Sequence, residues 1–337
     1  MPYSNAEMKV VALAGGVGGA KLVDGIAQVL PPENLTVIVN TGDDFEHLGL
    51  TICPDLDTIC YSLAGIANPD TGWGQAGETW NALESLARLG GPTWFHIGDK
   101  DLGTHLMRTH LLQAGLTLSQ VIEHFCRAWK ISVRVLPMSD HPVPTLLETD
   151  EGQLTFQEYF VQRQCTPRIA SIQFKDVESV TPAPGVLGAI CEATLIVICP
   201  SNPWISIDPI LVIPGVRSAL MENSRPGQII LAVSPIIGGK AIKGPAAKIF
   251  AEMGIEPSAL AVAQHYGSIK SGGLLTGFIM DRLDVDLVDA VTQIGIGALS
   301  TNGLMKTLDD RRRLAKEVLT FGSELLSHQE EKGSNNL

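Results

Sequence analysis

A glycine-rich segment directly after an apolar run is the strongest restriction on how this chain can fold. The apolar run KVVALA, residues 9–14, has the composition of a buried strand, and GGVGGAKL, residues 15–22, follows it. Such a loop brings backbone N–H groups close to a ligand, and the N-terminus of the next helix attracts an anion. The segment predicts a phosphate site, with the candidate residues Gly15, Gly16, Gly18, Gly19 and, as an extra cation, Lys21. The alternative is that the glycines only form a tight turn.

Two common nucleotide-binding fingerprints do not match this loop. A dinucleotide site needs G-x-G-x-x-G/A and an acidic residue about 20 residues later, but Lys21 stands at the third small position and the second predicted strand ends in Asn40. A P-loop needs G-x-x-x-x-G-K-S/T, but Ala20 and Leu22 stand in place of the last glycine and the hydroxyl residue. A nicotinamide-dependent enzyme and a P-loop NTPase are therefore disfavoured.

Short β-branched runs alternate along the chain with amphipathic helical patterns. A predicted helix at 21–29 and the run LTVIVN follow the first strand, and similar apolar runs recur after residue 131. This alternation predicts an α/β fold with a Rossmann-like, mostly parallel sheet flanked by helices. Apolar residues at three-to-four spacing predict further helices at 56–64, 79–89, 102–114 and 118–128, and a last one at 308–326.

The same patterns predict how the chain is divided. Residues 8–43 and 131–326 are expected to form the sheet domain, and residues 44–130 a small, mainly helical insertion after the second strand. Residues 1–7 resemble a leader before a natural start at Met8, and the polar segment 327–337 is expected to be a mobile tail.

Charge and cysteine content limit the expected partners and compartment. The 36 acidic residues outnumber the 24 Lys and Arg residues, which gives a formal net charge of −12, so neither nucleic acid nor an anionic membrane is an expected partner. The six cysteines form no C-x-x-C pair, and no apolar stretch reaches the length of about 18 residues that a membrane span needs. We expect a soluble, cytoplasmic protein with reduced thiols.

Four aspartates follow the second predicted strand: Asp43, Asp44, Asp55 and Asp57. In parallel sheets ligands bind at the carboxyl ends of the strands, where this cluster and the glycine loop should both emerge. Acids would repel a phosphate unless a hard cation lies between them, and Mg²⁺ binds both carboxylate and phosphate oxygens. The pairing predicts a magnesium-bridged phosphoester. Alternatively, Asp43 or Asp44 makes an Asx turn and Asp57 caps a helix that begins near Thr58.

The motif GDKDLGTHLMR supplies two further cations, Lys100 and Arg108. They are candidates for contacts with anionic or carbonyl groups of a substrate, and the alternative is that they are solvated surface charges. His105 and His110 are five residues apart and do not share a helix face, so a zinc site is disfavoured.

Later loops add short polar groups. Ser201 and Asn202 follow an apolar strand and are candidates for hydrogen bonds to a base or ribose, and Thr145 ends a proline-fixed loop. The sequence contains no G-x-S-x-G elbow and no Cys/His pair at a recognisable family spacing, so covalent catalysis has no support.

Eight motifs occur in one order between about Met8 and Leu326: GGVGGAKL, NTGDD, PDLDT, GWGQAGETWN, GDKDLGTHLMR, LPMSDHPVPT, SNPWISIDPIL and SPIIGGKAIKGPA. This set closely resembles the 2-phospho-L-lactate transferase family of coenzyme F-420 biosynthesis. The resemblance implies transfer of a phospho-acid, of the phospholactyl or phosphoenolpyruvyl type, from a guanosine diphosphate-linked donor to the ribityl hydroxyl of the deazaflavin Fo, with release of GMP. It also implies Mg²⁺ dependence, a homodimer, and a Rossmann-like core with a small helical subdomain.

The resemblance further implies roles for individual residues. The first glycine loop, Ser201 and Asn202 resemble parts of a guanosine diphosphate site, and Asp43 and Asp57 resemble metal-binding or catalytic acids. Asp57 and Lys100 match positions near the deazaflavin, although some family members have arginine in place of Lys100. We expect the deazaflavin ring near Asp57, Lys100 and Thr145, with Arg108 as a further substrate-binding candidate.

One alternative function comes from a different class. A related family of nucleotide-sugar-binding regulatory proteins, linked to gluconeogenesis and cell shape, shares the first glycine loop. Such a protein is not expected to carry GWGQAGETWN and GDKDLGTHLMR, both of which are present here. An enzyme that transfers a phospho-acid to Fo is therefore the favoured interpretation.

Overall fold

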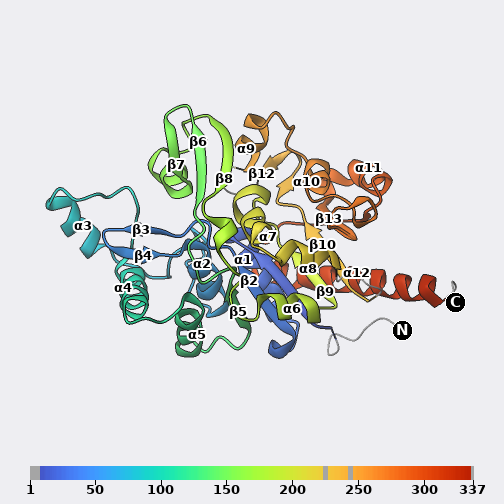
Figure 1. Cartoon of the computed structure of the whole chain (residues 1–337), viewed down its shortest axis with the longest axis horizontal. Coiled ribbons are helices and arrows are strands. Elements are labelled where there is room, and N and C mark those ends of the chain that lie inside the picture. Colours follow the sequence, from blue (N-terminus) through green and yellow to red (C-terminus); the bar gives the residue numbers. More distant parts are fainter. Residues whose placement is uncertain (1–7, 223–226, 242–245, 335–337) are drawn as a thin grey trace.

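A computed structural model of the chain describes residues 8–222, 227–241 and 246–334 (Figure 1). The predicted leader at residues 1–7 and the last part of the predicted tail, residues 335–337, lie outside these ranges. The last helix does not end at Leu326 as the pattern predicts but continues to Ser334, into the predicted tail. The sequence in this part is rich in good helix formers and has no proline to end the helix.

A seven-stranded parallel sheet is the centre of the fold, with the strand order β14-β13-β10-β9-β1-β2-β5 in the described residues. Its strands are β1 (Val10–Ala14), β2 (Leu35–Val39), β5 (Arg134–Pro137), β9 (Leu195–Ile198), β10 (Ile229–Val233), β13 (Gly277–Asp281) and β14 (Gly297–Thr301). This is the Rossmann-like α/β class that the sequence predicts. Strand β14 has no apolar β-branched run, and only its pairing with β13 identifies it.

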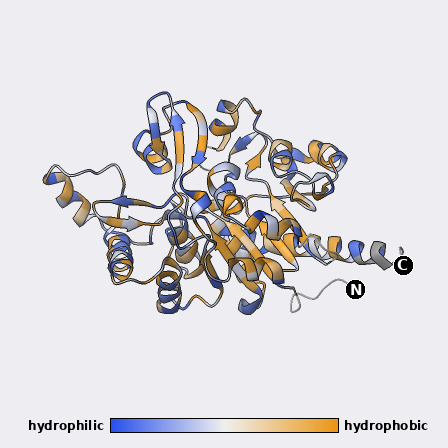
Figure 2. Cartoon of the chain, in the orientation of Figure 1, coloured by the Kyte–Doolittle hydropathy of each residue, from blue (hydrophilic) through white to orange (hydrophobic). Residues whose placement is uncertain are grey.

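Strand β1 is buried on both faces, because helices cover the sheet on either side. Val11 and Leu13 belong to one hydrophobic core, and Val10, Ala12 and Ala14 belong to the other. This alternation follows from the period of two in a strand, and it explains why the strand reads as a continuous apolar run. Figure 2 shows the apolar residues concentrated in these central strands.

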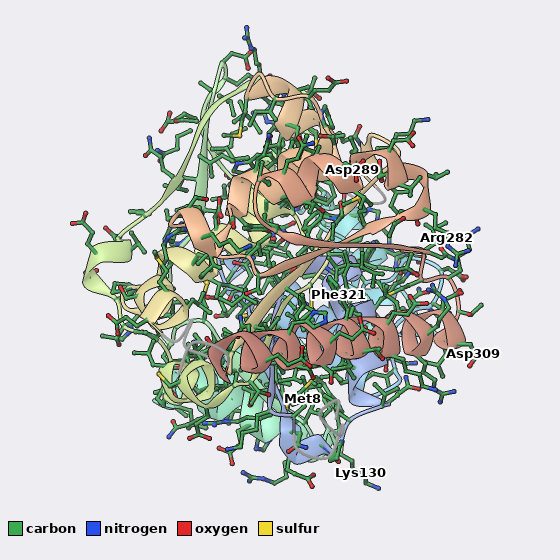
Figure 3. All side chains as sticks on the ribbon, turned by 90° about the vertical axis from the view of Figure 1, so that its right-hand side faces the viewer. Met8, Lys130, Arg282, Asp289, Asp309 and Phe321 are labelled. Carbon is green, nitrogen blue, oxygen red and sulfur yellow. The ribbon has the colours of Figure 1, made fainter. Side chains whose placement is uncertain are left out.

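Two helical layers form the outer parts of these cores (Figure 1). The first layer, which packs with Val10, Ala12 and Ala14, contains α1 (Gly16–Ala27), α2 (Pro54–Leu63), α5 (Leu118–Ala128) and α12 (Leu308–Ser334). The second contains α6 (Val186–Glu192), α7 (Asp208–Val212), α8 (Val216–Glu222), α9 (Ala246–Glu252), α10 (Ala259–Tyr266) and α11 (Val288–Gln293). Figure 3 shows α12 across one face of the molecule, with Phe321 in its middle and Asp309 near its start.

Residues 44–130 contain the four helices that the sequence predicts and, in addition, a short hairpin that it does not predict. They begin with a hairpin of β3 (Phe45–His47) and β4 (Leu50–Ile52), whose turn places Leu48 and Gly49 at positive φ. Helix α4 (Asp99–Gln113) packs beside β4, whereas α3 (Asn81–Arg88) buries none of its residues. Helices α2 and α5 share the core of the sheet. The division into a sheet domain and an insertion stays a prediction.

Two smaller sheets follow. The first pairs β6 (Thr145–Thr149) with β7 (Gly152–Thr155) and β8 (Ile169–Phe174), and the second pairs β11 (Ile236–Ile237) with β12 (Lys240–Ala241). In the described residues no single helix is long and apolar enough to cross a membrane. One bent pair of helices, residues 203–212 with 216–222, is together long and apolar enough, by length and composition alone.

Candidate functional site

The strand order reverses between β1 and β9, and three loops emerge together at this point. Leu13 of β1 pairs with Ile38 of β2 on one side and with Ile198 of β9 on the other. In open α/β sheets a ligand crevice forms at such a reversal, outside the carboxyl ends of the strands. A cavity of about 650 Å³ lies here, and its walls include residues of the loops after β1, β2 and β9.

The glycine loop belongs to helix α1, which begins at Gly16 and not at Lys21 as the pattern predicts. Close packing explains why glycines occupy its first turn: a Cβ atom at Gly18 would lie 2.3 Å from the carbonyl oxygen of Pro200, and one at Gly19 would lie 2.7 Å from the Ser201 hydroxyl. Gly16 has φ of +63° and faces open space. The glycines therefore let the helix N-terminus and the loop after β9 meet at the cavity, which Gly15, Gly16, Gly18 and Lys21 line.

The loop after β9 is tied to the glycine loop by Ser201. Its hydroxyl donates to the Gly15 carbonyl oxygen at 2.8 Å and accepts from the Gly15 N–H at 3.2 Å. The Asn202 side-chain oxygen accepts from the Trp204 N–H at 3.1 Å, whereas its buried Nδ2 has no hydrogen-bond partner in the described part of the chain. This amide is an unsatisfied donor in the wall of the cavity. Lys21 donates from Nζ to the Met305 carbonyl oxygen at 3.0 Å.

Asp55 holds the helix start in place, a role that the sequence analysis does not assign to it. One carboxylate oxygen accepts from the Gly16 N–H at 2.7 Å and the other accepts from Asn40 Nδ2 at 2.9 Å. The same Nδ2 donates to Asp43 at 3.0 Å. Asn40, which takes the place of a ribose-binding acid, therefore joins Asp43 after β2 to Asp55, which in turn holds the start of α1. The D-x-D spacing is the only sequence signal for Asp55.

The buried acids repel one another. Burial raises the pKa of Asp43 well above its ordinary value, and the charge of Asp55 raises it further, against the hydrogen bond from Asn40. Burial likewise raises the pKa of Asp55 to about 6, although hydrogen bonds from Asn40 and Gly16 oppose the rise. Burial also raises the pKa of Asp44, whose Oδ1 has no hydrogen-bond partner in the described residues. A cation at this place would relieve the repulsion.

Asp57 forms a buried ion pair with Arg108 from helix α4. The alternative that Asp57 caps its helix is wrong, because α2 begins at Pro54, three residues earlier, with Cys53 at the cap position. Burial raises the pKa of Asp57, and Arg108 opposes the rise. The second oxygen, Oδ2, lies 3.7 Å from His105 Nδ1 and has no hydrogen-bond partner in the ranges described.

His105 is held in one tautomer by the same arginine. Burial lowers its pKa to about 3, so the ring is neutral near pH 7. Arg108 Nη1 lies 3.1 Å from Nδ1, and because a guanidinium only donates, Nδ1 accepts and the ring proton is on Nε2. His105 lines the cavity, and its Nε2–H makes no hydrogen bond to the described residues.

Magnesium fits the chemistry of these acids. The residues are carboxylates, the ligand type that Mg²⁺ prefers, and Asp57 Oδ2 is a buried oxygen without a hydrogen-bond partner in the described chain. No three His, Cys, Asp or Glu side chains in the described residues converge on one metal position. Mg²⁺ commonly uses one or two carboxylates together with substrate phosphates, so this donor set remains sufficient.

The other predicted substrate-binding residues do not line the cavity. Lys100 is exposed, and its Nζ donates to the Ala76 carbonyl oxygen at 2.6 Å. Thr145 is fully buried, with its backbone N–H bound to the Gly42 carbonyl oxygen at 2.8 Å. Arg108 is fully buried behind Asp57. Their roles in substrate binding stay predictions.

Aromatic side chains form the other walls of the cavity, which the sequence analysis missed. Trp94 and Phe95 lie on one side, where they contact His47 and Phe45 of the β3–β4 hairpin. The rings of Phe156 and Phe160 stack with a centroid distance of 5.4 Å and also line the cavity. The sequence signal was the pair of adjacent aromatics in PTWFHIGD. Such walls suit a planar ring.

Asp101 and Tyr61 are a second pair of cavity residues that the sequence analysis did not identify. The Tyr61 hydroxyl donates to Asp101 Oδ1 at 2.6 Å. Burial raises the pKa of Asp101 to about 7. Asp101 lies in the first turn of α4 and Tyr61 on α2, so no sequence spacing connects them.

Comparisons with known proteins agree on one family. Residues 10–293 match the family model described as 2-phospho-L-lactate transferase CofD. A phosphoenolpyruvate transferase from Streptomyces coelicolor is 42% identical over 323 residues, which cover 94% of this chain and 99% of that protein. A phosphoenolpyruvate transferase from Thermobifida fusca is 41% identical over 300 residues, which cover 85% of this chain and 90% of that protein.

A solved structure supports the fold. A protein of the UPF0052 family from Bacillus halodurans matches with a TM-score of 0.58 at 16% sequence identity, and the match covers 92% of this chain and 98% of that one. At this identity the likeness concerns the fold alone.

Proposed function

Because the chain belongs to the 2-phospho-L-lactate transferase CofD family, we propose that it transfers a phosphoenolpyruvyl group from a guanosine diphosphate-linked donor to the ribityl hydroxyl of the deazaflavin Fo, releasing GMP. The family and its relatives establish the coarser statement, that the chain is a phosphoenolpyruvate- or phospholactate-type transferase of coenzyme F-420 biosynthesis. The enolpyruvyl donor is favoured over the lactyl donor because relatives at 40–43% identity carry the name phosphoenolpyruvate transferase.

One observation carries the proposal: a single cavity is lined at once by the N-terminal residues of α1 and by a group of aromatic side chains. The positive N-terminal end of α1 and the unpartnered side-chain amide of Asn202 in the loop after β9 suit a nucleoside diphosphate, because the one attracts an anion and the other supplies an N–H donor. Trp94, Phe95 and Phe160 suit the flat deazaflavin ring. Donor and acceptor would therefore meet at the aspartates that line the same cavity.

In this proposal the side chains and backbone of the protein position the donor and the acceptor and neutralise the charge of the diphosphate. The Gly15 and Gly16 N–H groups are already bound by Ser201 and Asp55, so the N–H groups that follow them in the first turn of α1 orient the diphosphate. Asp55, held by Asn40, keeps this helix start rigid. Arg108 fixes Asp57, and the N–H of neutral His105 is available to a substrate oxygen. Mg²⁺ bound by Asp43 and Asp57 would neutralise charge on the diphosphate during transfer.

Product analysis tests the proposal. The protein is incubated with Fo, Mg²⁺ and either the enolpyruvyl- or the lactyl-diphospho-guanosine donor, and the products are identified by mass spectrometry. We expect phosphoenolpyruvyl-Fo and GMP in equal amounts, formed faster than the lactyl product. Nucleotide binding without any turnover of Fo would instead support the regulatory alternative.

Calorimetry tests the choice of nucleotide. We expect GDP to bind more tightly than ADP, because the SNPW loop matches the guanosine site of the family and presents the free amide of Asn202. Equal or tighter binding of ADP would contradict the guanosine assignment.

A further inference from the structure

The cavity contains one aspartate whose carboxylate is not held by an amide or a cation. Asp55 binds the Gly16 N–H and Asn40, Asp43 binds Asn40, and Asp57 is paired with Arg108. Asp101 differs, because its carboxylate accepts only the hydroxyl hydrogen bond of Tyr61 among the described residues. A carboxylate without a fixed cation keeps its affinity for a proton.

The backbone of Asp101 is fixed at the start of helix α4. Glu78 accepts from the Lys100 N–H at 2.8 Å and from the Asp101 N–H at 2.9 Å, so it caps the helix from a separate loop. Gly98 allows this approach, since a Cβ atom there would lie 2.2 Å from the Glu78 carboxyl carbon. The side chain of Asp101 therefore starts from a rigid position.

The second oxygen of Asp101 is open to a ligand. Tyr61 donates to Oδ1, whereas Oδ2 accepts no hydrogen bond in the part of the chain described. Unlike Asp57 Oδ2, this oxygen is not completely buried. The Gly74 backbone lies beside it, such that a Cβ atom at Gly74 would be 3.6 Å from Oδ2. Both residues line the cavity, as does Trp73.

The surroundings of Asp101 set its protonation near neutrality. Burial raises its pKa to about 7. The Tyr61 hydrogen bond opposes the rise, the charges of Asp57 and Glu78 add to it, and Arg108 opposes it. A general base works best when its pKa lies near the working pH, so the environment of Asp101 suits this task.

We propose that Asp101 is the general base of the transfer, with Oδ2 accepting the proton of the acceptor's hydroxyl group. The inference rests on the function proposed above. The hydroxyl oxygen forms a bond to phosphorus while its proton moves to Oδ2. The bond between that phosphorus and the departing GMP phosphate oxygen breaks, and its electron pair leaves with GMP. Asp101 then releases the proton to water.

The test compares Asp101→Asn with Asp286→Asn, a matched control at an exposed aspartate that does not line the cavity. We expect kcat of Asp101→Asn to fall by about 10²- to 10⁴-fold, while KM for Fo and the affinity for GDP stay within about twofold. The Asp286→Asn enzyme should match the wild type. Thermal unfolding of each variant shows whether it is folded.

A second variant, Tyr61→Phe, separates a base from a purely structural carboxylate. In the wild type kcat should rise with pH through about 7 and then level off. Loss of the Tyr61 hydrogen bond, which lowers the pKa of Asp101, should move this limb to higher pH. A normal kcat in Asp101→Asn, or an unmoved limb in Tyr61→Phe, would overturn the inference. A wild-type enzyme that forms no product from Fo would overturn the proposed function itself.

Discussion

Arg108 is a fully buried charge, and its partner is Asp57. Replacing Asp57 by Asn leaves this guanidinium without a counter-charge, so we expect the free energy of unfolding to fall by about 3–5 kcal/mol. The double variant Asp57→Asn, Arg108→Met removes both charges and should regain most of that stability. Chemical denaturation measures the loss and the recovery. An Asp57→Asn protein as stable as the wild type would show that the pair contributes little.

The double variant also tests Asp57 in the reaction. If Asp57 helps to hold Mg²⁺ against the diphosphate, turnover should stay at least about 100-fold below the wild type even after stability returns. Turnover that returns together with stability would make Asp57 structural. The metal would then have to be bound at Asp43 and Asp44.

His105 is neutral near pH 7, because burial lowers its pKa to about 3. Its titration therefore cannot produce a kcat limb near pH 7. We expect His105→Gln to lower kcat through loss of the Nε2–H donor, while the position of the limb on the pH axis stays the same. A pH profile measured at saturating Fo checks this, and a limb displaced by more than about half a unit would point to His105 as the titrating group.

At the scale of elements, the contact between α1 and the loop after β9 depends on Gly18. A Cβ atom there would lie 2.3 Å from the Pro200 carbonyl oxygen, a backbone atom that cannot move without separating the two elements. We expect Gly18→Ala to lower the free energy of unfolding by about 1–3 kcal/mol and to weaken GDP binding. Thermal unfolding and calorimetry measure these two effects.

Gly103→Ala is the matched control for that substitution. Gly103 is exposed in helix α4, and a Cβ atom there meets nothing within 4 Å. Alanine should stabilise this helix by about 0.5–1 kcal/mol and leave GDP affinity unchanged. If both variants behave alike, close packing at Gly18 is not what the glycine provides.

At the scale of the whole molecule, the buried acids give stability a pH dependence. The pKa of Asp55 rises from 3.8 to about 6 and that of Asp101 to about 7, so the folded state keeps protons that the unfolded chain releases. The contribution of these two groups to the free energy of unfolding is therefore fully present below about pH 4, and it is lost as the pH rises through about 6 to 7. We expect a lower Tm at pH 7.5 than at pH 5.5 without Mg²⁺, and a smaller difference in Asp101→Asn. A Tm that rises over this range in the wild type would contradict this.

Magnesium should reverse part of this loss. A cation that binds only the folded protein stabilises it by mass action, about 2.7 kcal/mol at 100 times its Kd. We expect Mg²⁺ to raise Tm more at pH 7.5 than at pH 5.5, because burial raises the pKa of Asp43 and Asp57 and these acids are therefore less ionised at the lower pH. Asp43→Asn should reduce the increase, and removal of Mg²⁺ with a chelator should restore the original Tm. An equal effect at both pH values would argue against a site built from these acids.

The sequence predicts the class of the fold and the place of the site, because both follow from local patterns. The apolar run before Gly15 identifies β1, and the run before Asn40 identifies β2. A strand, a glycine loop and a helix can be read from neighbouring residues, and parallel strands bring their carboxyl ends to one edge. The short hairpin of β3 and β4 was missed, since three-residue strands are too short to show a period.

The contacts within the site depend on the tertiary structure. Arg108 reaches Asp57 across 51 residues, Asp55 reaches the Gly16 N–H across 39, and Tyr61 reaches Asp101 across 40. No local pattern distinguishes a buried arginine from a surface one, so Arg108 was predicted only as a substrate-binding candidate. The sequence thus determines the elements and the residue types at one edge of the sheet. Side-chain pairs between α2 and α4, and the close approach of α1 to the loop after β9, decide which of those residues are paired and which keep an unpartnered oxygen. Burial and pairing arise only when segments distant in the sequence meet.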